Sequence, residues 1–311
     1  MSKSLLIDVC DSNNADNYIW SMLFFRIDRR SDTQPYTFYK VRFKNDGYLL
    51  TYAKSLMDSV KKYQISPIET VQEYDGNNTK VSCDKISIEN ELIAHEWSLF
   101  SDALANSSDE KIKNKINGYI LYGNHRENET ETISFIKWAN PFTNLTNKSK
   151  VFFTTTADDE LDLFSDDVCR LYLNIDILIT GNTLYTYNYN FERLFDIEKT
   201  MSKIKKEAIQ RIADTNVFSD ADKFAAYASQ YTSNRTFVTL KQERIDRIKN
   251  KKNRKAVAAI LKLELDKSGK FVVDSKGKAA LLIKYLCYKI FKDGETNDVL
   301  EASSISTLTI E

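Results

Sequence analysis

The sequence predicts an α+β fold, with a sheet-rich N-terminal domain followed by a basic, mostly helical C-terminal domain. All three prolines lie in the first half, and no glycine occurs between Gly181 and Gly269, which favours uninterrupted helices there. Before residue 189 the apolar residues follow the period of strands, and after it the period of helices. At 311 residues the chain is long enough for two domains. We place them at 1–188 and 189–311.

The N-terminal domain is predicted to consist of short strands interrupted by two amphipathic helices. β-branched and aromatic residues between polar turns predict the strands. These are Tyr18–Asp28, Thr37–Phe43, Tyr119–Gly123, Ile133–Trp138 and Val151–Thr155. The two helices are expected at Asp46–Tyr63 and Glu89–Ala105.

The clearest predicted strand runs from Cys169 to Thr180. Every odd position is apolar and the even positions are mainly polar, which predicts one buried and one solvated face. Gly181 and Asn182 then supply the positive φ angles of a tight hairpin, and Leu184–Asn188 returns.

The C-terminal domain is predicted to contain at least four helices. Asn190 is the expected N-cap of the first, whose apolar stripe runs from Phe191 to Ile212, and a second begins at Ser219 and Asp220. A third covers a basic run and continues through AVAAILKLEL. The remaining expectations are a strand at Lys270–Val273, a turn at Ser275–Gly277, a helix to Phe291 and an extended end at Asn297–Ile310.

The charge of the chain is strongly polarised although its formal sum is zero. Residues 189–292 contain 24 Lys/Arg and 12 Asp/Glu, whereas the remainder contains 20 and 32. The imbalance is greatest at 241–255, KQERIDRIKNKKNRK, with eight cations and two acids. A basic face of this kind attracts polyanions, of which nucleic acid is the commonest. The candidate nucleic-acid-binding residues are Lys241, Arg244, Arg247, Lys249, Lys251, Lys252, Arg254 and Lys255.

On one continuous helix, Arg244, Arg247, Lys251 and Arg254 would share a face. Ile245, Ile248, Ala256 and Ala259 would then seat the neighbouring face on the domain. Such a stripe reaches successive phosphates without base-specific chemistry. The alternative is an ordinary solvated helix, but few local acids neutralise this stripe. Nothing in the run distinguishes DNA from RNA.

The sequence argues against an enzyme. The acidic stretch at 157–168 could hold Mg²⁺ for a nuclease through acids such as Asp158, Asp159 and Asp162, but the chain has no Glu-x-Lys motif. A solvated loop or an acidic protein-binding surface is the favoured interpretation of this stretch. His95, expected to be half-buried, and His125 are the only histidines. No catalytic residue, cofactor or metal is therefore assigned.

The chain is expected to be cytoplasmic. Its first residues lack the apolar core of a signal peptide, and no apolar run has the length of a membrane span. The four cysteines are far apart in the sequence, which favours reduced thiols.

Two segments resemble the KwaB-like family, the soluble subunit of the Kiwa antiphage defence system. They are LYLNIDILITGNTLYTYNYNFERLF at 171–195 and LKLELDKSGKFVVDSKGKAALLIKYL at 261–286, after the basic stretch. The resemblance covers roughly residues 150–305, and its motifs are structural rather than catalytic.

The resemblance implies a protein that self-associates, as a homodimer or larger, and works with KwaA, a multi-pass membrane partner that recruits it to the inner face of the cell membrane. It also implies binding of phage DNA without sequence specificity, which obstructs replication and transcription. Two other functions stay open: a metal-dependent nuclease, and a scaffold whose basic face binds an acidic protein or anionic lipid.

Overall fold

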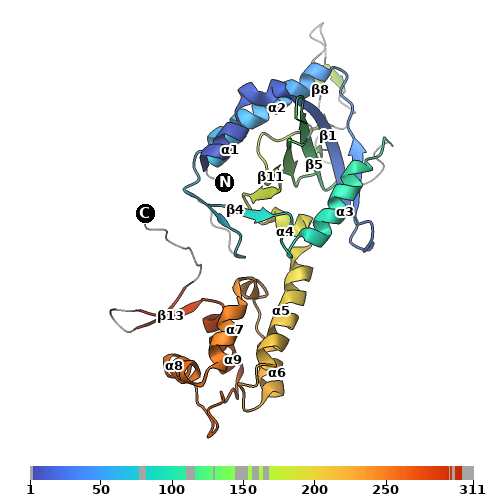
Figure 1. Ribbon diagram of the computed structural model, residues 1–311. Helices are drawn as coiled ribbons and strands as arrows, with labels where there is room; N and C mark the ends of the chain where they lie inside the picture. The colour runs from blue at the N-terminus through green and yellow to red at the C-terminus, as the bar shows by residue number, and fades with distance from the viewer. Residues whose placement is uncertain are drawn as a thin grey trace. The chain divides into compact units, whose positions relative to one another are not determined.

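The computed structural model describes residues 3–76, 82–109, 116–128, 130–143, 153–155, 161–163, 168–293, 295 and 298–302. The chain forms two compact units (Figure 1). Unit 1 consists of Met1–Glu73 and Thr79–Phe195, and unit 2 of Tyr74–Asn78 and Asp196–Glu311. Unit 1 contains an eight-stranded sheet and unit 2 is mostly helical, which confirms the predicted α+β class.

The sheet of unit 1 has the strand order β2-β1-β5-β6-β11-β12-β4-β3. Its strands are β1 (Tyr18–Ile27), β2 (Tyr36–Lys40), β3 (Thr70–Glu73), β4 (Ser82–Ser87), β5 (Gly118–His125), β6 (Thr132–Lys137), β11 (Ile177–Thr180) and β12 (Thr183–Thr186). All neighbours are antiparallel except β3 and β4, which are parallel. Two small pairs lie outside it: β7 (Phe142–Thr143) with β10 (Val168–Cys169), and β8 (Phe153–Thr155) with β9 (Leu161–Leu163).

Helices cover both faces of this sheet (Figure 1). On one face, α1 (Lys3–Val9), the short 3₁₀ helix at Ser12–Asn17 and α2 (Asp46–Val60), continued by a π-helical turn at Lys61–Ile65, pack on residues such as Met22 and Phe24. On the other face, α3 (Ala94–Ala105) directs Phe100 against Phe38, with ring centroids 5.0 Å apart. Aromatic packing on both faces therefore fixes the register of β1 and β2.

The predicted strand from Cys169 to Thr180 was wrong over most of its length. Only Val168–Cys169 and Ile177–Thr180 are strands, and Leu173 is exposed. Between these two strands, backbone N–H and carbonyl groups form hydrogen bonds with side chains instead of with a neighbouring strand. The Gln64 side chain both donates to the Ile175 carbonyl and accepts from its N–H, each at 2.8 Å. The Tyr119 hydroxyl accepts from the Tyr172 N–H at 2.6 Å. Distant side chains thus replace a neighbouring strand, which the alternating pattern does not indicate.

Other elements of unit 1 differ from their predictions at the ends. The second helix begins at Ala94 rather than Glu89, because the backbone from Asn90 to Ile93 forms a turn. The second strand ends at Lys40, before the predicted Phe43. The hairpin between β11 and β12 is confirmed, but only Gly181 has a positive φ, of 54°.

The predicted helix from Asn190 is broken in two. α4 (Asn190–Leu194) belongs to unit 1, and α5 (Ile197–Ala213) belongs to unit 2. Between them, Phe195 is buried and Asp196 has a left-handed backbone with φ 46°. Tyr189, and not Asn190, is the N-cap of α4. The units therefore divide between Phe195 and Asp196, whereas the pattern of the sequence predicts a boundary between residues 188 and 189.

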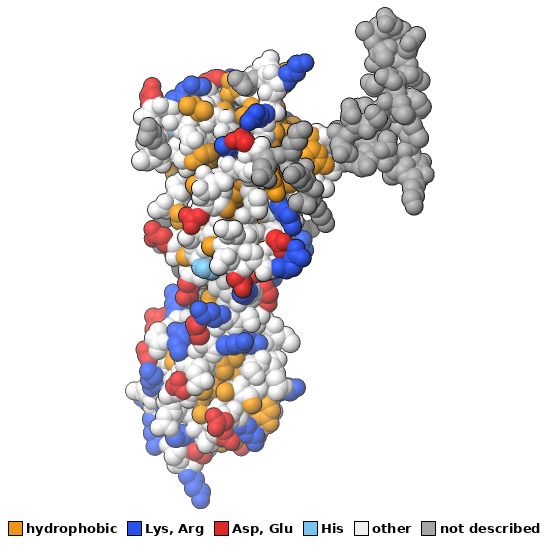
Figure 2. All heavy atoms as spheres, turned by 90° about the vertical axis from the view of Figure 1, so that its right-hand side faces the viewer, with side chains coloured by type: hydrophobic (Ala, Val, Ile, Leu, Met, Phe, Trp, Pro, Cys, Tyr) orange, Lys and Arg blue, Asp and Glu red, His pale blue; other side chains and the backbone are white. Residues whose placement is uncertain are grey.

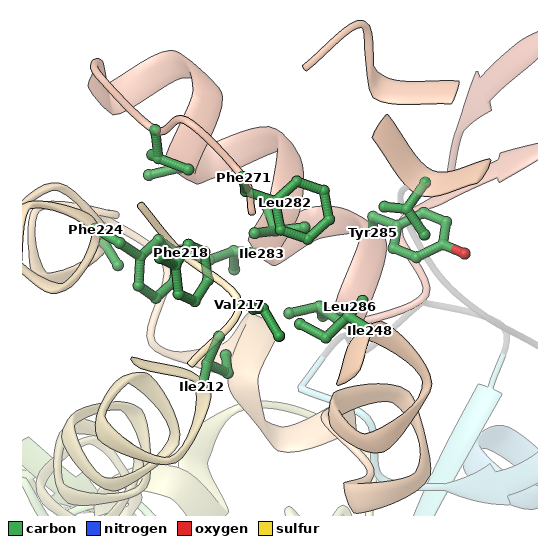
Figure 3. Close-up of a cluster of buried hydrophobic side chains, with 14 of the residues drawn as sticks. Ile212, Val217, Phe218, Phe224, Ile248, Phe271, Leu282, Ile283, Tyr285 and Leu286 are labelled. Atoms are coloured by element: carbon green, nitrogen blue, oxygen red, sulfur yellow. The ribbon is translucent and has the colours of Figure 1, made fainter. Parts of the chain in front are cut away.

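Unit 2 is built around a single core (Figure 3). Its helices are α5, α6 (Ala221–Ser229), a 3₁₀ helix at Arg235–Thr239, α7 (Gln242–Lys249), α8 (Lys251–Leu261) and α9 (Lys276–Leu286), followed by the hairpin of β13 (Ile290–Lys292) and β14 (Val299–Glu301). Phe218 and Phe224 stack at 4.0 Å between centroids, and Ile248 and Leu286 meet on the α7 side of this core (Figure 3). Asp220 is the N-cap of α6, which confirms the predicted start of that helix.

Several predictions for unit 2 were wrong. Lys270–Val273 is not a strand; Phe271 makes only isolated bridges, to Phe218 and Leu265. Ser275 is the N-cap of α9 rather than part of a turn, and α9 ends at Leu286 instead of Phe291. The prediction of an extended C-terminal stretch is confirmed at Val299–Glu301, which forms β14. Asn297 and residues 303–311 lie outside the described residues, as do Val151 and Phe152 of the strand predicted there.

Candidate nucleic-acid interface

The basic run at 241–255 forms two helices and not one. α7 ends at Lys249, and Asn250 has an extended backbone with φ −76° and ψ 127°. Its side chain accepts hydrogen bonds from the N–H groups of Lys252 and Asn253, at 2.9 and 3.3 Å. An asparagine that satisfies the free N–H groups of a new first turn acts as an N-cap. The prediction of a continuous helix with four cations on one face was therefore wrong.

Arg254 is engaged inside unit 2. Its guanidinium donates to the carbonyls of Ile248 at 3.1 Å and Lys249 at 2.8 Å, and also to that of Gly269 at 2.9 Å. The first two carbonyls belong to the last turn of α7, which has no further helical N–H groups to bond. Arg254 thus stabilises the end of α7 from α8, so that it holds the angle between the two helices.

Arg244 is also used internally. Its guanidinium carbon lies 3.9 Å from the centre of the Tyr288 ring and 5.1 Å from that of Tyr285. The Tyr288 hydroxyl donates to Glu243 at 2.5 Å, and this hydrogen bond, followed by burial, raises the pKa of Tyr288. Cation–π contacts of this kind fix a guanidinium against the ring faces. Arg244 therefore connects α7 to the end of α9.

The other six candidate residues are exposed. They are Lys241, Arg247, Lys249, Lys251, Lys252 and Lys255. Lys249 forms an ion pair with Asp246 at 2.6 Å, which contributes to a lowered pKa of that carboxyl. Within the part of the chain that the structure describes, the other five make no side-chain hydrogen bond or ion pair. The structure therefore separates the eight candidates into two internal arginines and six surface cations.

Of the four residues predicted to pack this segment on the domain, two are buried. Ile245 and Ile248 are buried beneath α7, as expected. On α8 the buried residues are Val257, Ala258 and Leu261, whereas Ala256 and Ala259 are exposed. The break at Asn250 restarts the helical phase, and the residues facing the core shift accordingly. An asparagine within a run of lysines is the sequence signal that could have indicated the break.

On one side of the molecule the cations do not form a separate patch. Figure 2 views the side that lies to the right in Figure 1, and there Lys and Arg side chains are mixed with Asp and Glu. A site for a polyanion therefore depends on the local excess of cations in a particular segment. Within the described residues, the α7–α8 segment at 241–255 carries six exposed cations beside two acids.

The acidic residues considered for a metal site are not described by the structure, or are described only in their backbone. Asp158 and Asp159 lie outside the described residues, and nothing is described of the Asp162 side chain in β9. Among the described residues, no group of three or more His, Cys, Asp or Glu is arranged to hold a metal ion. His95 is exposed on α3, so the expectation of a half-buried histidine was wrong. A helix long and apolar enough to span a membrane is likewise not found in the described ranges.

A comparison with protein families identifies one match. Residues 114–292 match the family described as Kiwa protein KwaB-like, a span that includes β5, β6 and β11 as well as α5 to α9. The match begins well before residue 150, where the resemblance in the sequence starts. No curated protein and no solved structure matches the chain. Because the family model covers more than half of the sequence, this chain belongs to the KwaB-like family of Kiwa proteins.

Proposed function

We propose that this chain is an effector of Kiwa antiphage defence that binds DNA without sequence specificity and performs no catalysis. Membership of the KwaB-like family supports the defence role. The observation that carries the DNA-binding part is the surface of α7 and α8, where six exposed cations lie within fifteen residues beside two acids. Flexible cations on a helical surface suit contacts to phosphate, which supply essentially all of non-specific affinity.

The proposed contact consists of Arg247, Lys251, Lys252 and Lys255, with Lys241 preceding α7. Each is free to meet a phosphate, whereas Arg244 and Arg254 already bind within unit 2. Such binding occupies any stretch of phage DNA, and in this way it obstructs replication and transcription. If five phosphates are neutralised, the logarithm of the association constant should fall with the logarithm of salt with a slope of about −4 to −5.

The decisive experiment is a charge reversal with a matched control. The fourfold change of Arg247, Lys251, Lys252 and Lys255 to Glu should abolish DNA binding and phage protection while the fold is retained. The control changes Lys206, Lys223, Lys267 and Lys276 to Glu. They are four exposed lysines of unit 2 outside this segment, and the change in net charge is the same. Fluorescence anisotropy with unrelated duplexes measures the affinity. Equal loss of DNA affinity in both variants would show that binding has no local site. Undiminished binding by the α7–α8 variant would refute the proposal.

We also propose that the chain acts as a homodimer or larger oligomer and is recruited to the inner face of the cell membrane by a KwaA-like multi-pass protein. Family membership supports the existence of a Kiwa partner. The protein should fractionate as soluble when expressed alone and move to membranes when the partner is co-expressed. Membrane association without a partner would contradict the recruitment, and a monomer in light scattering at micromolar concentration would contradict the self-association.

A further inference from the structure

The first part of one edge of β1 has no strand beside it. β1 pairs with β5 from Tyr18 to Phe25, but with β2 only from Leu23 to Ile27. The Val41 N–H donates to the Met22 carbonyl at 2.9 Å, so the even-numbered residues of β1 direct their backbone groups to the β2 side. In the described structure, the N–H and carbonyl of Trp20 and the N–H of Met22 therefore lack a strand partner.

This edge carries none of the features that protect exposed strands. Natural sheets discourage pairing with charged side chains, proline or a bulge. The sequence from Tyr18 to Met22 is YIWSM, with no charge and no proline. Ile19 is 54% exposed although it lies in the middle of the free segment. An open, uncharged edge is the surface to which an extended chain adds.

A groove of about 1210 Å³ opens beside this edge and extends across the sheet over β5, β6 and β11. The free segment of β1 forms one side, and the chain from Lys40 to Phe43 with the start of α2 forms another. Trp97 of α3 and Tyr122 of β5 add aromatic surface. The space next to Tyr18–Ser21 is thus open, and it is where a longer β2 would lie.

The polar lining of the groove is cationic. Lys40 and Arg42 share one carboxylate, that of Asp109, at 3.2 and 3.3 Å. The guanidinium of Arg126, at the other end of the free segment, donates to the Asp16 carbonyl at 2.9 Å. Among the described residues that line the groove, Asp109 is the only acid, so three cations face one carboxylate. An occupant with acidic side chains complements this charge.

We propose that unit 1 binds an extended acidic segment of a partner protein, which adds as a strand to the free edge of β1 at Tyr18–Met22. Main-chain hydrogen bonds to Trp20 and Met22 give affinity, and acidic side chains directed to Lys40, Arg42 and Arg126 give selectivity. This site goes beyond the proposed DNA contact, because it uses neither α7 nor α8.

Synthetic peptides test the strand addition directly. Acetylated peptides of ten residues that alternate valine with glutamate or aspartate are compared by calorimetry with matched series that alternate valine with lysine or with serine. The acidic series should bind about tenfold tighter than the serine series, since it meets cations along the groove. N-methylation of two alternate residues on the pairing edge should weaken binding about tenfold, because two hydrogen bonds to the β1 edge are lost. Hydrogen exchange at Trp20 and Met22 should slow when the unmodified peptide binds.

A charge-reversed variant locates the site. Arg42→Glu should lower the affinity for acidic peptides about fivefold to tenfold, whereas Lys62→Glu, an exposed change outside the groove, should leave it within about twofold. The fourfold α7–α8 variant should bind the peptides normally, which separates this proposal from the DNA contact. Equal affinity for the acidic and lysine series, or no effect of N-methylation, would overturn it. The proposal would also be overturned if single-stranded DNA displaced the peptide and if Arg42→Glu no longer bound single-stranded DNA.

Discussion

The two units use their charged side chains in opposite ways. In unit 1 several charges are internal: Asp176 is 1% exposed and accepts hydrogen bonds from Lys137, the Trp138 N–H and Asn188. In unit 2 the core shown in Figure 3 is apolar, and most cations lie at its surface. Breaking a buried ion pair destabilises the fold. Exposed cations contribute little to the free energy of folding, and they are accessible to a ligand.

Among the cations of unit 2, Arg244 and Arg254 behave as the charges of unit 1 do. Each is held by groups of its own unit, namely tyrosine rings for Arg244 and helix-end carbonyls for Arg254. Charge density in the sequence therefore does not by itself identify the residues that are free to bind. The comparison predicts that substitutions of internal charges act on stability, and those of surface cations on binding.

The largest effect is expected for Asp176→Ala. Removing this carboxylate leaves the Lys137 ammonium without its partner at 3.2 Å, and the Trp138 N–H and Asn188 without an acceptor. Breaking one side of a buried pair costs about 3–5 kcal/mol. Urea unfolding of unit 1 measures it. Asp102→Ala, on the exposed side of α3, is the control and should change stability by less than about 0.5 kcal/mol. Equal effects of the two changes would contradict a structural role for Asp176.

A smaller loss of stability is expected for Arg254→Ala. The change removes three charged hydrogen bonds, two of them to the last turn of α7, and should cost about 2 kcal/mol. Thermal unfolding measures this loss. At a temperature where the variant is folded, its DNA affinity should fall less than that of Arg247→Ala. The opposite order, with binding lost and stability kept, would place Arg254 at the phosphate contact.

How much of this arrangement the sequence predicts depends on the range of the interactions involved. Local signals succeeded: Asp220 caps α6 as predicted, and β1, β5 and β6 lie where their β-branched and aromatic residues indicate. The class and the division into a sheet-rich and a helical part followed from the change in period near residue 190.

The failures have two physical causes, namely partners distant in sequence and local caps that interrupt a helical pattern. The backbone of Ile175 bonds to Gln64, which is 111 residues away, and alternation alone cannot reveal that pairing. The basic run failed at Asn250, where a local cap outweighed the continuous helical pattern. For the candidate site, the sequence identified the segment and the exposed lysines. It could not show that Arg244 lies on Tyr288, because that contact requires the fold of α9 and the turn that follows.

Single surface cations should alter binding with almost no change in stability. Arg247→Ala should weaken binding to all duplexes alike and make the salt slope shallower by about one unit, since one phosphate contact is lost. Its free energy of unfolding should stay within about 0.5 kcal/mol of the wild type, because the side chain is exposed. Lys206→Ala on α5 is the control and should leave the slope unchanged. A sequence-dependent loss would indicate contact with base edges instead of phosphates.

The smallest effect concerns pH and the turn between α8 and α9. The hydroxyl of Ser268 and the N–H of Lys270 donate to Asp266 and lower the pKa of its carboxyl. Because the folded pKa lies below the unfolded one, the ionised group adds stability above the unfolded pKa of about 3.9, and that stability is lost as pH falls through the folded value. Asp266→Asn keeps an oxygen acceptor and removes the charge. Its unfolding temperature should therefore lie slightly below that of the wild type at neutral pH, and the difference should shrink as pH falls through the folded pKa. A difference that stays constant over this range would show that the charge of Asp266 does not stabilise the turn.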